Sequence, residues 1–385
     1  MVTIVVLIIL SAVAIGLSLG DNGIITSAKE ATDGWKQSSE SEQEGLKQIA
    51  NLIKSNGNSN GGSGNEEVKK LQDITGNEIE NTITQDKFGN KIIIPAGFKV
   101  INPEDDVRKG IVIEDVSAKG ATEHTKGSQF VWIPVGEIYT DVKQMVENKK
   151  TITLGRYIFN SAGSPTAISD NYKEYTNENY DSDYENVIAK DIEDFIKKAT
   201  LSHGYYIGRY ELGDATAKNY ERKGTNDKSD RSDPVACKKD IYPYTYINQA
   251  DASSLCQEMY NSKQFECDLI NSYAWDTAIV FIQSFSGDSN YSRQSSKGGF
   301  DVEKCGNSYL LNVDPGNIKQ DVRCNIFDMA GNTYEWSTET YCFGVNNCIS
   351  RGGCYYIDDA CTSNRNASDT IYTGGNMSAR PIIYL

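Results

Sequence analysis

This sequence has little histidine and a shortage of positively charged residues. Its 385 residues include two histidines, His124 and His203, and neither is accompanied by the local signature residues of a catalytic site. A Ser-His-Asp triad is therefore not predicted, and both histidines are interpreted as structural or surface residues. Lys and Arg number 38 against 53 Asp and Glu, which gives a net charge of −15. Because this charge repels phosphate backbones, no nucleic acid partner is expected.

Cysteine is absent from the first 236 residues, and all nine cysteines lie between Cys237 and Cys361. They belong to one module, and their odd number leaves at least one unpaired. An extracellular module permits disulfides, and Cys342 with Cys348 would close a short loop, although the connectivity does not follow from the sequence. No two cysteines have the two-residue spacing of a zinc site, and no glycine-rich stretch has the context of a phosphate-binding loop.

Charge is also absent from residues 1–19, which are almost wholly apolar. Their length suits the roughly 20 residues of a membrane-spanning helix. A secretory signal normally starts with positive charge, and because no Lys or Arg precedes this stretch, a secretory signal is not predicted. An amphipathic helical period follows, to Ile53. With the sequence Leu-Gly-Asp-Asn-Gly-Ile-Ile at 19–25, this arrangement resembles the stem of type IV pilin-like proteins of low-GC Gram-positive bacteria. The resemblance implies a membrane anchor and other pilins as partners. The family's leader and first mature residues are missing here, so filament membership stays open.

The rest of the chain divides by composition. The sequence predicts a pilin-like stem at 1–54, a flexible Gly/Ser/Asn-rich linker at 55–86 and a head at 87–385. In the head, short β-branched runs predict strands at 91–95, 110–113, 129–134 and 204–211. Helical spacing predicts three helices, one over 187–199 and two capped by Asn248 and Ser272. This mixed order indicates an α+β fold.

Several segments of the head resemble, in order, the formylglycine-generating-enzyme-like family, which has a variant of the C-type lectin fold. They are residues 204–211, 242–244, 252–256, 269–276, 328–336 and 350–353. The most specific is Gly-Asn-x-x-Glu-Trp at 331–336. The resemblance covers about residues 130–385 and implies a C-type lectin-like head.

The same motif has a direct physical interpretation. Gly331 and Asn332 suit a left-handed turn, and Tyr334 and Trp336 alternate around Glu335 as residues of a strand do. Aromatic side chains with this alternation usually pack inward, so we interpret them as core anchors. Members of the family can hold a calcium ion near this turn. Nothing in the sequence requires one, and no cofactor is predicted.

Enzymes of the family hold copper with two cysteines, five residues apart, downstream of Arg-Gly-Gly-Ser. Here Cys354 stands at the serine position, Cys361 follows seven residues later, and Ile357 occupies the first cysteine position. This spacing does not reproduce the opposed thiolates that Cu(I) needs. The related iron-dependent oxygenases need a cluster of His and carboxylates, which two distant histidines do not supply. A copper-dependent oxidase is therefore the weaker hypothesis, and no catalytic residue is predicted.

Residues 341–376 contain no Glu, Gln, Lys, Met or Trp. They are rich in Tyr, Asn, Asp, Ser, Thr and Gly, the side chains that dominate antibody paratopes. Every residue of this window is Asn or is encoded after changes to the adenines of an AAC codon. At the C-terminal end of a lectin-like fold, such a restriction resembles the variable proteins of diversity-generating retroelements, whose ligand-contacting residues are rewritten by adenine-directed mutagenesis. An ordinary Asn/Tyr-rich loop is the alternative.

These observations predict an externally displayed, membrane-anchored protein whose head binds a protein or glycan and catalyses no reaction. Ser350 to Gly353 and residues 379–385 form the expected frame, the latter as a closing strand with alternate apolar side chains. The acidic charge favours a neutral or cationic ligand surface. A structural minor pilin is the further alternative. The candidate ligand contacts are Tyr355, Tyr356, Asp358, Asp359, Asn364, Asn366, Asp369 and Tyr372.

Overall fold

The computed structural model divides the chain into two compact units, Met1–Glu66 and Glu67–Leu385. The predicted stem lies outside the described residues, as does the predicted linker up to residue 67. In the part that is described, no helix has the length and apolar character to cross a membrane. All described residues belong to the second unit, called the head here: 68–168, 172–174, 190–217, 234–295, 302–310, 319–341, 347–357, 360–369 and 371–385.

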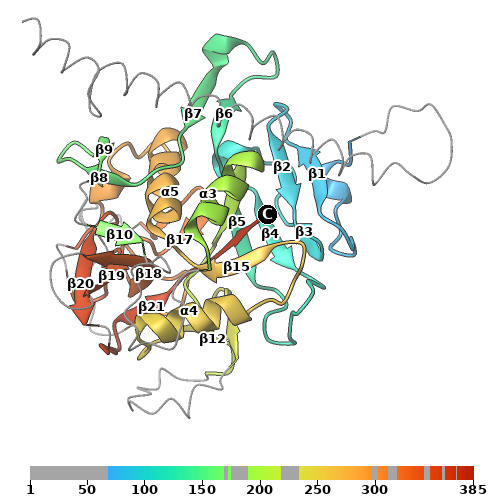
Figure 1. Ribbon diagram of the computed structural model, residues 1–385. Coiled ribbons are helices and arrows are strands. Elements are labelled where there is room, and N and C mark those ends of the chain that lie inside the picture. The colour runs from blue at the N-terminus through green and yellow to red at the C-terminus, as the bar shows by residue number, and fades with distance from the viewer. Residues whose placement is uncertain are drawn as a thin grey trace, which may run out of the picture. The chain divides into compact units, whose positions relative to one another are not determined.

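A six-stranded antiparallel sheet forms the centre of the head (Figure 1). The last strand of the sequence lies inside this sheet, hydrogen-bonded to β15 on one side and β11 on the other. The strands, in spatial order, are β15 (Glu266–Leu269), β22 (Pro381–Tyr384), β11 (Gly204–Gly208), β5 (Gln129–Pro134), β4 (Val112–Asp115) and β3 (Phe98–Val100).

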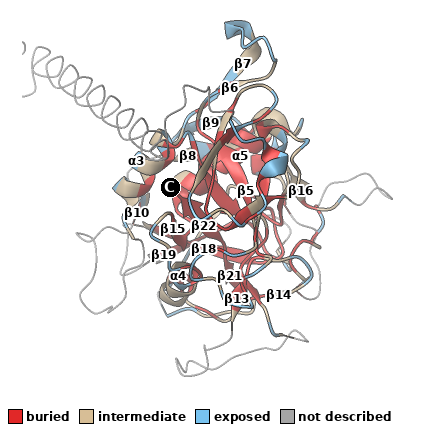
Figure 2. Ribbon diagram, turned by 90° about the vertical axis from the view of Figure 1, so that its right-hand side faces the viewer, coloured by how far each residue is buried: buried red, intermediate tan, exposed pale blue. Residues whose placement is uncertain are grey.

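Both faces of this sheet are covered, which explains why its central strands have no polar face (Figure 2). Trp132 and Tyr206 belong to one apolar core, whereas Ile133 and Tyr205 belong to the other. A Cβ at Gly204 would lie 2.4 Å from the Trp132 ring, so glycine is required where β11 begins.

Three helices pack on these cores, and each starts at a side-chain cap. They are α3 (Ile192–Leu201), α4 (Gln249–Glu258) and α5 (Ser272–Phe285). Asn248 caps α4 in a reciprocal capping box with Asp251, as the sequence predicts. The predicted cap Ser272 is wrong by one residue: Asn271 caps α5 by accepting a hydrogen bond from the backbone N–H of Ala274, 2.8 Å away.

A second sheet, called the window sheet here, contains the strands that the window of residues 341–376 contributes (Figure 1). Its strands β10 (Tyr172–Glu174), β18 (Tyr334–Tyr341), β19 (Asn347–Arg351) and β20 (Arg365–Asp369) are antiparallel, and β21 (Met377–Ala379) runs parallel to β18. A single residue, Arg380, separates β21 from β22. The predicted closing strand at 379–385 thus corresponds to β22, and Ala379 at its start belongs to β21 of the window sheet.

The remaining elements are short. The 3-10 helices are Leu71–Asp73, Val107–Lys109, Val146–Asn148 and Tyr291–Arg293. The paired strands are β1 (Thr82–Gln85) with β2 (Lys91–Ile94), β6 (Gly136–Tyr139) with β7 (Lys149–Ile152), β8 (Tyr157–Phe159) with β9 (Pro165–Ala167), β12 (Gly213–Asp214) with both β13 (Val235–Ala236) and β14 (Tyr242–Pro243), and β16 (Val322–Arg323) with β17 (Ile326–Phe327). Helices segregated from antiparallel sheets confirm the α+β prediction.

The head starts earlier than the sequence predicts. The sequence predicts a linker up to residue 86, but β1 pairs with β2 along its whole length. Leu71 and Ile74 are buried in the core, and Thr84 is buried as well. The few apolar residues of this charged segment attach it to the head, because each packs into the core. The sequence does not reveal this, since these residues show no helical or strand period.

Cysteine and histidine occupy ordinary structural positions here. No disulfide joins any two of the cysteines within the described ranges, and Cys342, of the predicted Cys342–Cys348 loop, lies outside them. Cys237, Cys256, Cys267 and Cys305 are fully buried in an apolar core. His124 and His203 are exposed in turns, in agreement with their interpretation as surface residues.

Candidate ligand-binding site

The Gly-Asn-x-x-Glu-Trp segment forms the turn that leads into β18. Asn332 has the left-handed conformation, with φ of 67°, whereas Gly331 does not have a positive φ. The Asn332 amide donates to Glu211 Oε2 at 2.6 Å, and its oxygen accepts from the backbone N–H of Glu303 at 2.9 Å. Trp336 is buried and donates from Nε1 to the carbonyl of Ile247 at 2.8 Å. The prediction of a core anchor is confirmed.

Glu335, between the two aromatic residues, pairs with Arg380. Arg380 Nε lies 2.7 Å from Glu335 Oε2, and both side chains are buried. The guanidinium also donates to the carbonyls of Gly208 and Phe327, each at 2.9 Å. Burial raises the pKa of Glu335 to about 7, although Arg380 acts to lower it. Arg380 thus ties β18 to β11 at the junction of the two sheets.

Buried carboxylates outnumber cations around this pair. Asp328 accepts from the backbone N–H of Ser308 at 3.2 Å and from its hydroxyl at 2.6 Å. Burial raises the pKa of Asp328 to about 7, and burial together with Asp328 raises that of Glu211 well above its ordinary range. On β15, burial raises the pKa of Asp268 to about 6.

These shifts predict a head that becomes less stable as the pH rises from 5 to 8. A carboxyl whose pKa is raised in the folded state stabilises the fold at acid pH. This contribution is lost as the pH rises from the unfolded pKa to the folded pKa. Glu339, Asp106 and Glu78 have lowered pKa values, and their contributions are complete above about pH 5. We expect the free energy of unfolding, measured by urea titration at each pH, to fall by several kcal/mol, because each raised carboxyl removes about 1.4 kcal/mol per pH unit up to its folded pKa.

The control for this prediction is Asp268→Asn, because its pKa of about 6 is separated from the Glu335 and Asp328 values. The variant should show a shallower decline between pH 5 and 6 and the parental decline above pH 6. Stability that is constant or rises over this range would contradict the assignment.

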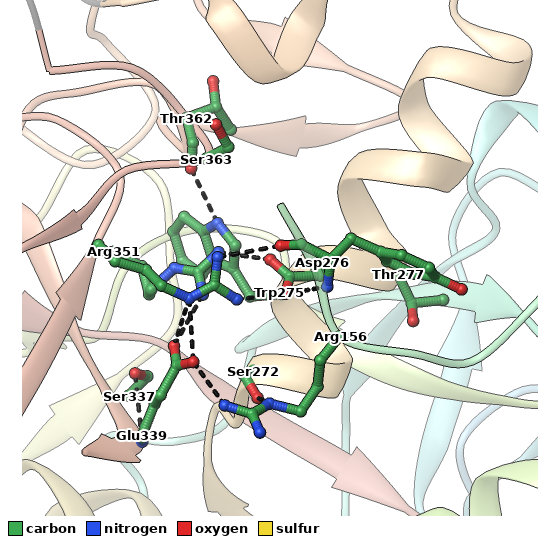
Figure 3. Close-up of polar contacts among 12 residues, drawn as sticks. Arg156, Ser272, Trp275, Asp276, Thr277, Ser337, Glu339, Arg351, Thr362 and Ser363 are labelled. Atoms are coloured by element: carbon green, nitrogen blue, oxygen red, sulfur yellow. Dashed lines mark hydrogen bonds and ion pairs between the residues drawn. The ribbon is translucent and has the colours of Figure 1, made fainter. Parts of the chain in front are cut away.

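A second buried ionic network lies beneath the window sheet, and we call it the arginine cluster: Arg156, Asp276, Glu339, Arg351 and Arg365. Glu339 on β18 contacts all three guanidinium groups, at distances of 2.8 to 2.9 Å. Asp276 on α5 pairs with Arg351 and Arg365. Figure 3 shows Arg351 between these two carboxylates, above the Trp275 ring.

Burial acts to raise the pKa of Glu339, but the three guanidinium groups of the arginine cluster together hold it below its ordinary value. Arg156 also donates from Nε to the Ser272 hydroxyl at 2.6 Å, which links the cluster to the start of α5 (Figure 3). The cluster therefore joins β18, β19, β20 and α5 through charge-assisted hydrogen bonds.

Two candidate tyrosines hydrogen-bond to one amide, and a third packs beside them. The rings of Tyr355 and Tyr356 meet edge to face with centroids 5.1 Å apart. Asn376 donates from Nδ2 to the Tyr356 hydroxyl at 3.0 Å, and the Tyr372 hydroxyl donates to Asn376 Oδ1 at 3.4 Å. Tyr356 is 51% exposed and Tyr372 is 41% exposed, while Asn376 is buried. We call these four residues the tyrosine cluster.

The other candidates lie along or beside β20. Asn364 and Asn366 flank Arg365 and are partly exposed, and Asp369 ends the strand exposed. The backbone N–H of Tyr372 donates to the carbonyl of Asp369 at 3.0 Å, so the strand leads directly into the turn that carries Tyr372. Asp358 and Asp359 lie outside the described residues.

Arg365 and Asn376 were missed by sequence reasoning, although both lie in the window. Apart from Arg351, Arg365 is the single basic residue of residues 341–376, and that isolation was a usable signal for a buried ionic partner. Asn376 carries no signal, since it is one of many asparagines there. The ionic partners of Arg365, Asp276 and Glu339, are distant in sequence.

The cysteines at the positions related to the copper enzymes show no fit to a thiolate pair. Burial raises the pKa of the Cys354 thiol, which disfavours the thiolate. Ile357 pairs with Cys354 through a backbone hydrogen bond of 3.2 Å, and Cys361 is buried with its sulfur 3.6 Å from the Ser363 hydroxyl. Within the described ranges, no group of three or more His, Cys, Asp or Glu is arranged to hold a metal.

Comparison with known proteins gives only distant structural similarities. No protein-family model matches the sequence, and no curated protein matches it. The crystal structure of CarF is similar with a TM-score of 0.31 and 14% identity, over 47% of this chain and 87% of that chain. Treponema denticola variable protein 1 has a TM-score of 0.33 and 11% identity, over 67% of this chain and 96% of that chain. At such TM-scores neither similarity supports an inference about fold or function.

Proposed function

We propose that this protein binds a protein or glycan ligand through the C-terminal window of its head. The observation that carries the proposal is the tyrosine cluster: exposed aromatic rings held in place by a buried amide. Tyrosine supplies a large amphipathic contact area at low conformational entropy cost, which is why it dominates binding loops. The proposal involves no catalytic step and no cofactor.

The supporting geometry is the contrast between frame and window. Ser350, Arg351, Gly352 and Gly353 are all buried, whereas Tyr356 and Tyr372 are among the exposed large hydrophobic side chains of the described residues. Rigid elements that present exposed loop residues are the usual construction of a binding site. A C-type lectin-like fold, display at the cell surface and anchoring through residues 1–19 belong to the same proposal.

Retroelement diversification of the window is the finer part of the proposal. The restricted composition of residues 341–376 coincides with side chains that are exposed or partly exposed at Tyr355, Tyr356, Asn364, Asn366 and Tyr372. Sequencing the locus in sister isolates tests it. Differences should concentrate at adenines in these codons. An even spread along the gene would overturn this part and leave ligand binding to the experiment that follows.

The ligand is expected to present a neutral or cationic surface, because the chain carries a net charge of −15. A panel of glycans and of purified surface proteins, each with neutral, basic and acidic members, provides the screen. Binding that requires an acidic ligand and weakens with salt would contradict this expectation.

The tyrosines of the cluster should carry the binding energy once a ligand is found. We expect Tyr356→Ser and Tyr372→Ser each to weaken binding by about 10-fold or more, since truncation of interface tyrosines commonly costs over 1 kcal/mol. Tyr309→Ser is the matched control, because Tyr309 is 45% exposed and lies outside the window. Titration calorimetry measures all three. Equal losses in the control, or none in the cluster variants, would place the ligand elsewhere.

A further inference from the structure

Arg365 lies inside the candidate binding window but points away from its surface. Its side chain is 6% exposed at the first position of β20. Arg365 Nε donates to both Glu339 oxygens, at 2.9 and 3.0 Å, and Nη2 pairs with Asp276 Oδ2. Nη1 donates to the carbonyl of Tyr157 at 3.0 Å. One side chain thus ties β20 to β18, to α5 and to β8.

The neighbours of Arg365 are placed differently. Asn364 and Asn366 are partly exposed, and strand alternation directs Asn366 to the face opposite Arg365. The Ser350 hydroxyl donates to the backbone carbonyl of Asn366 at 3.3 Å, a contact that does not depend on the Asn366 side chain. The side chains of Asn364 and Asn366 are therefore replaceable without loss of the contacts that hold β20, whereas that of Arg365 is not.

We infer that Arg365 is the fixed positioning residue of the binding window, and that the replaceable positions lie on either side of it, at Tyr355, Tyr356 and Asn364 and at Asn366 and Tyr372. The inference rests on the proposed function, since a positioning residue has meaning only beside residues that bind. The short side chains that rewriting an AAC codon can yield, such as Ser, Gly, Asp and Thr, are too short to span Glu339 and Asp276. Lysine keeps the charge but lacks the planar fork that bridges two carboxylates.

Hydrogen exchange in the full chain tests this inference without a ligand. We expect Arg365→Lys and Arg365→Asn to accelerate exchange of the β20 amides by about 10-fold or more, while amides of β5 and β11 exchange as in the parent. A residue with only a general stabilising role would accelerate both sheets together. Asn366→Ser and Asn366→Tyr are the matched controls and should leave β20 exchange unchanged. Parental exchange in Arg365→Lys, or faster exchange in the Asn366 variants, would overturn the inference.

Sister sequences give an independent test and keep the inference separable from the proposed function. An unchanged arginine codon at 365 amid changes at 364 and 366 supports it. Non-arginine codons at 365 in a window that otherwise varies overturn it and leave ligand binding intact. A window without any variation overturns the retroelement part of the proposed function, and hydrogen exchange then decides the role of Arg365. If Arg365→Asn fails to fold, Arg365→Lys carries the exchange test.

Discussion

Glu339→Gln is expected to lower the free energy of unfolding of the head by about 3–5 kcal/mol, the cost of breaking a buried ion pair by removing one partner. Glu339 is fully buried and is the carboxylate shared by Arg156, Arg351 and Arg365. Glutamine preserves the shape, but it removes the charge and turns an N–H donor toward other donors. Asp276 then remains as the single acidic member of the arginine cluster. Urea titration monitored by circular dichroism measures the change.

The control is Glu123→Gln, which removes the same charge from the Lys126 pair at a side chain that is 86% exposed. Its expected effect is below about 1 kcal/mol, as for other exposed ion pairs. A loss of under 1 kcal/mol in Glu339→Gln as well would show that the arginine cluster stabilises the head no more than a surface pair does.

Arg380→Met is expected to cost about 3–5 kcal/mol for the same physical reason at the junction of the two sheets. The change leaves Glu335 buried without its partner and removes the donors that reach the carbonyls of Gly208 and Phe327. Because Arg380 lowers the pKa of Glu335, its loss raises that pKa further. The stability deficit should therefore be smallest at pH 5, where the carboxyl is protonated, and should grow toward pH 8.

Thermal and urea unfolding across this pH range provides the measurement, and the double variant Arg380→Met, Glu335→Met provides the control. Replacing both members removes the unpaired charge, so the double variant should be more stable than Arg380→Met alone. A deficit that is independent of pH, or a double variant with the sum of two large losses, would contradict the assigned role of the pair.

Local signals in the sequence predicted the elements that depend on local physics. The run Gln129–Pro134 is the strand β5, and Asn248 caps α4, because β-branched runs and capping residues act within a few positions. The cap at Ser272 failed because Asn271 beside it is an equally good cap, and the Ser272 hydroxyl is instead engaged by Arg156. Adjacent candidates of similar propensity cannot be ranked without the packing that surrounds them.

Long-range pairing is what the sequence did not reveal. β22 was predicted as a closing strand, yet it lies within the central sheet, because its partners are selected by packing across more than a hundred residues. The exposed tyrosines were predicted from composition, but their meeting at Asn376 was not. The inward orientation of Arg365 depends on Glu339, Asp276 and Tyr157, which are distant in sequence. Such contacts leave no periodic trace.

The position of β22 also bears on protein synthesis. β22 follows the window in the reading frame and fills the centre of the main sheet between β15 and β11. While the ribosome is still translating the window, that sheet has a gap, so the head completes its folding only after residue 384 leaves the exit tunnel. An insertion or deletion that shifts the reading frame within codons 355–372 also changes the sequence of β22. A chain with such an error lacks β22, cannot complete its core and is exposed to proteolysis. In-frame changes to the surface residues of the window leave β22 and the core intact.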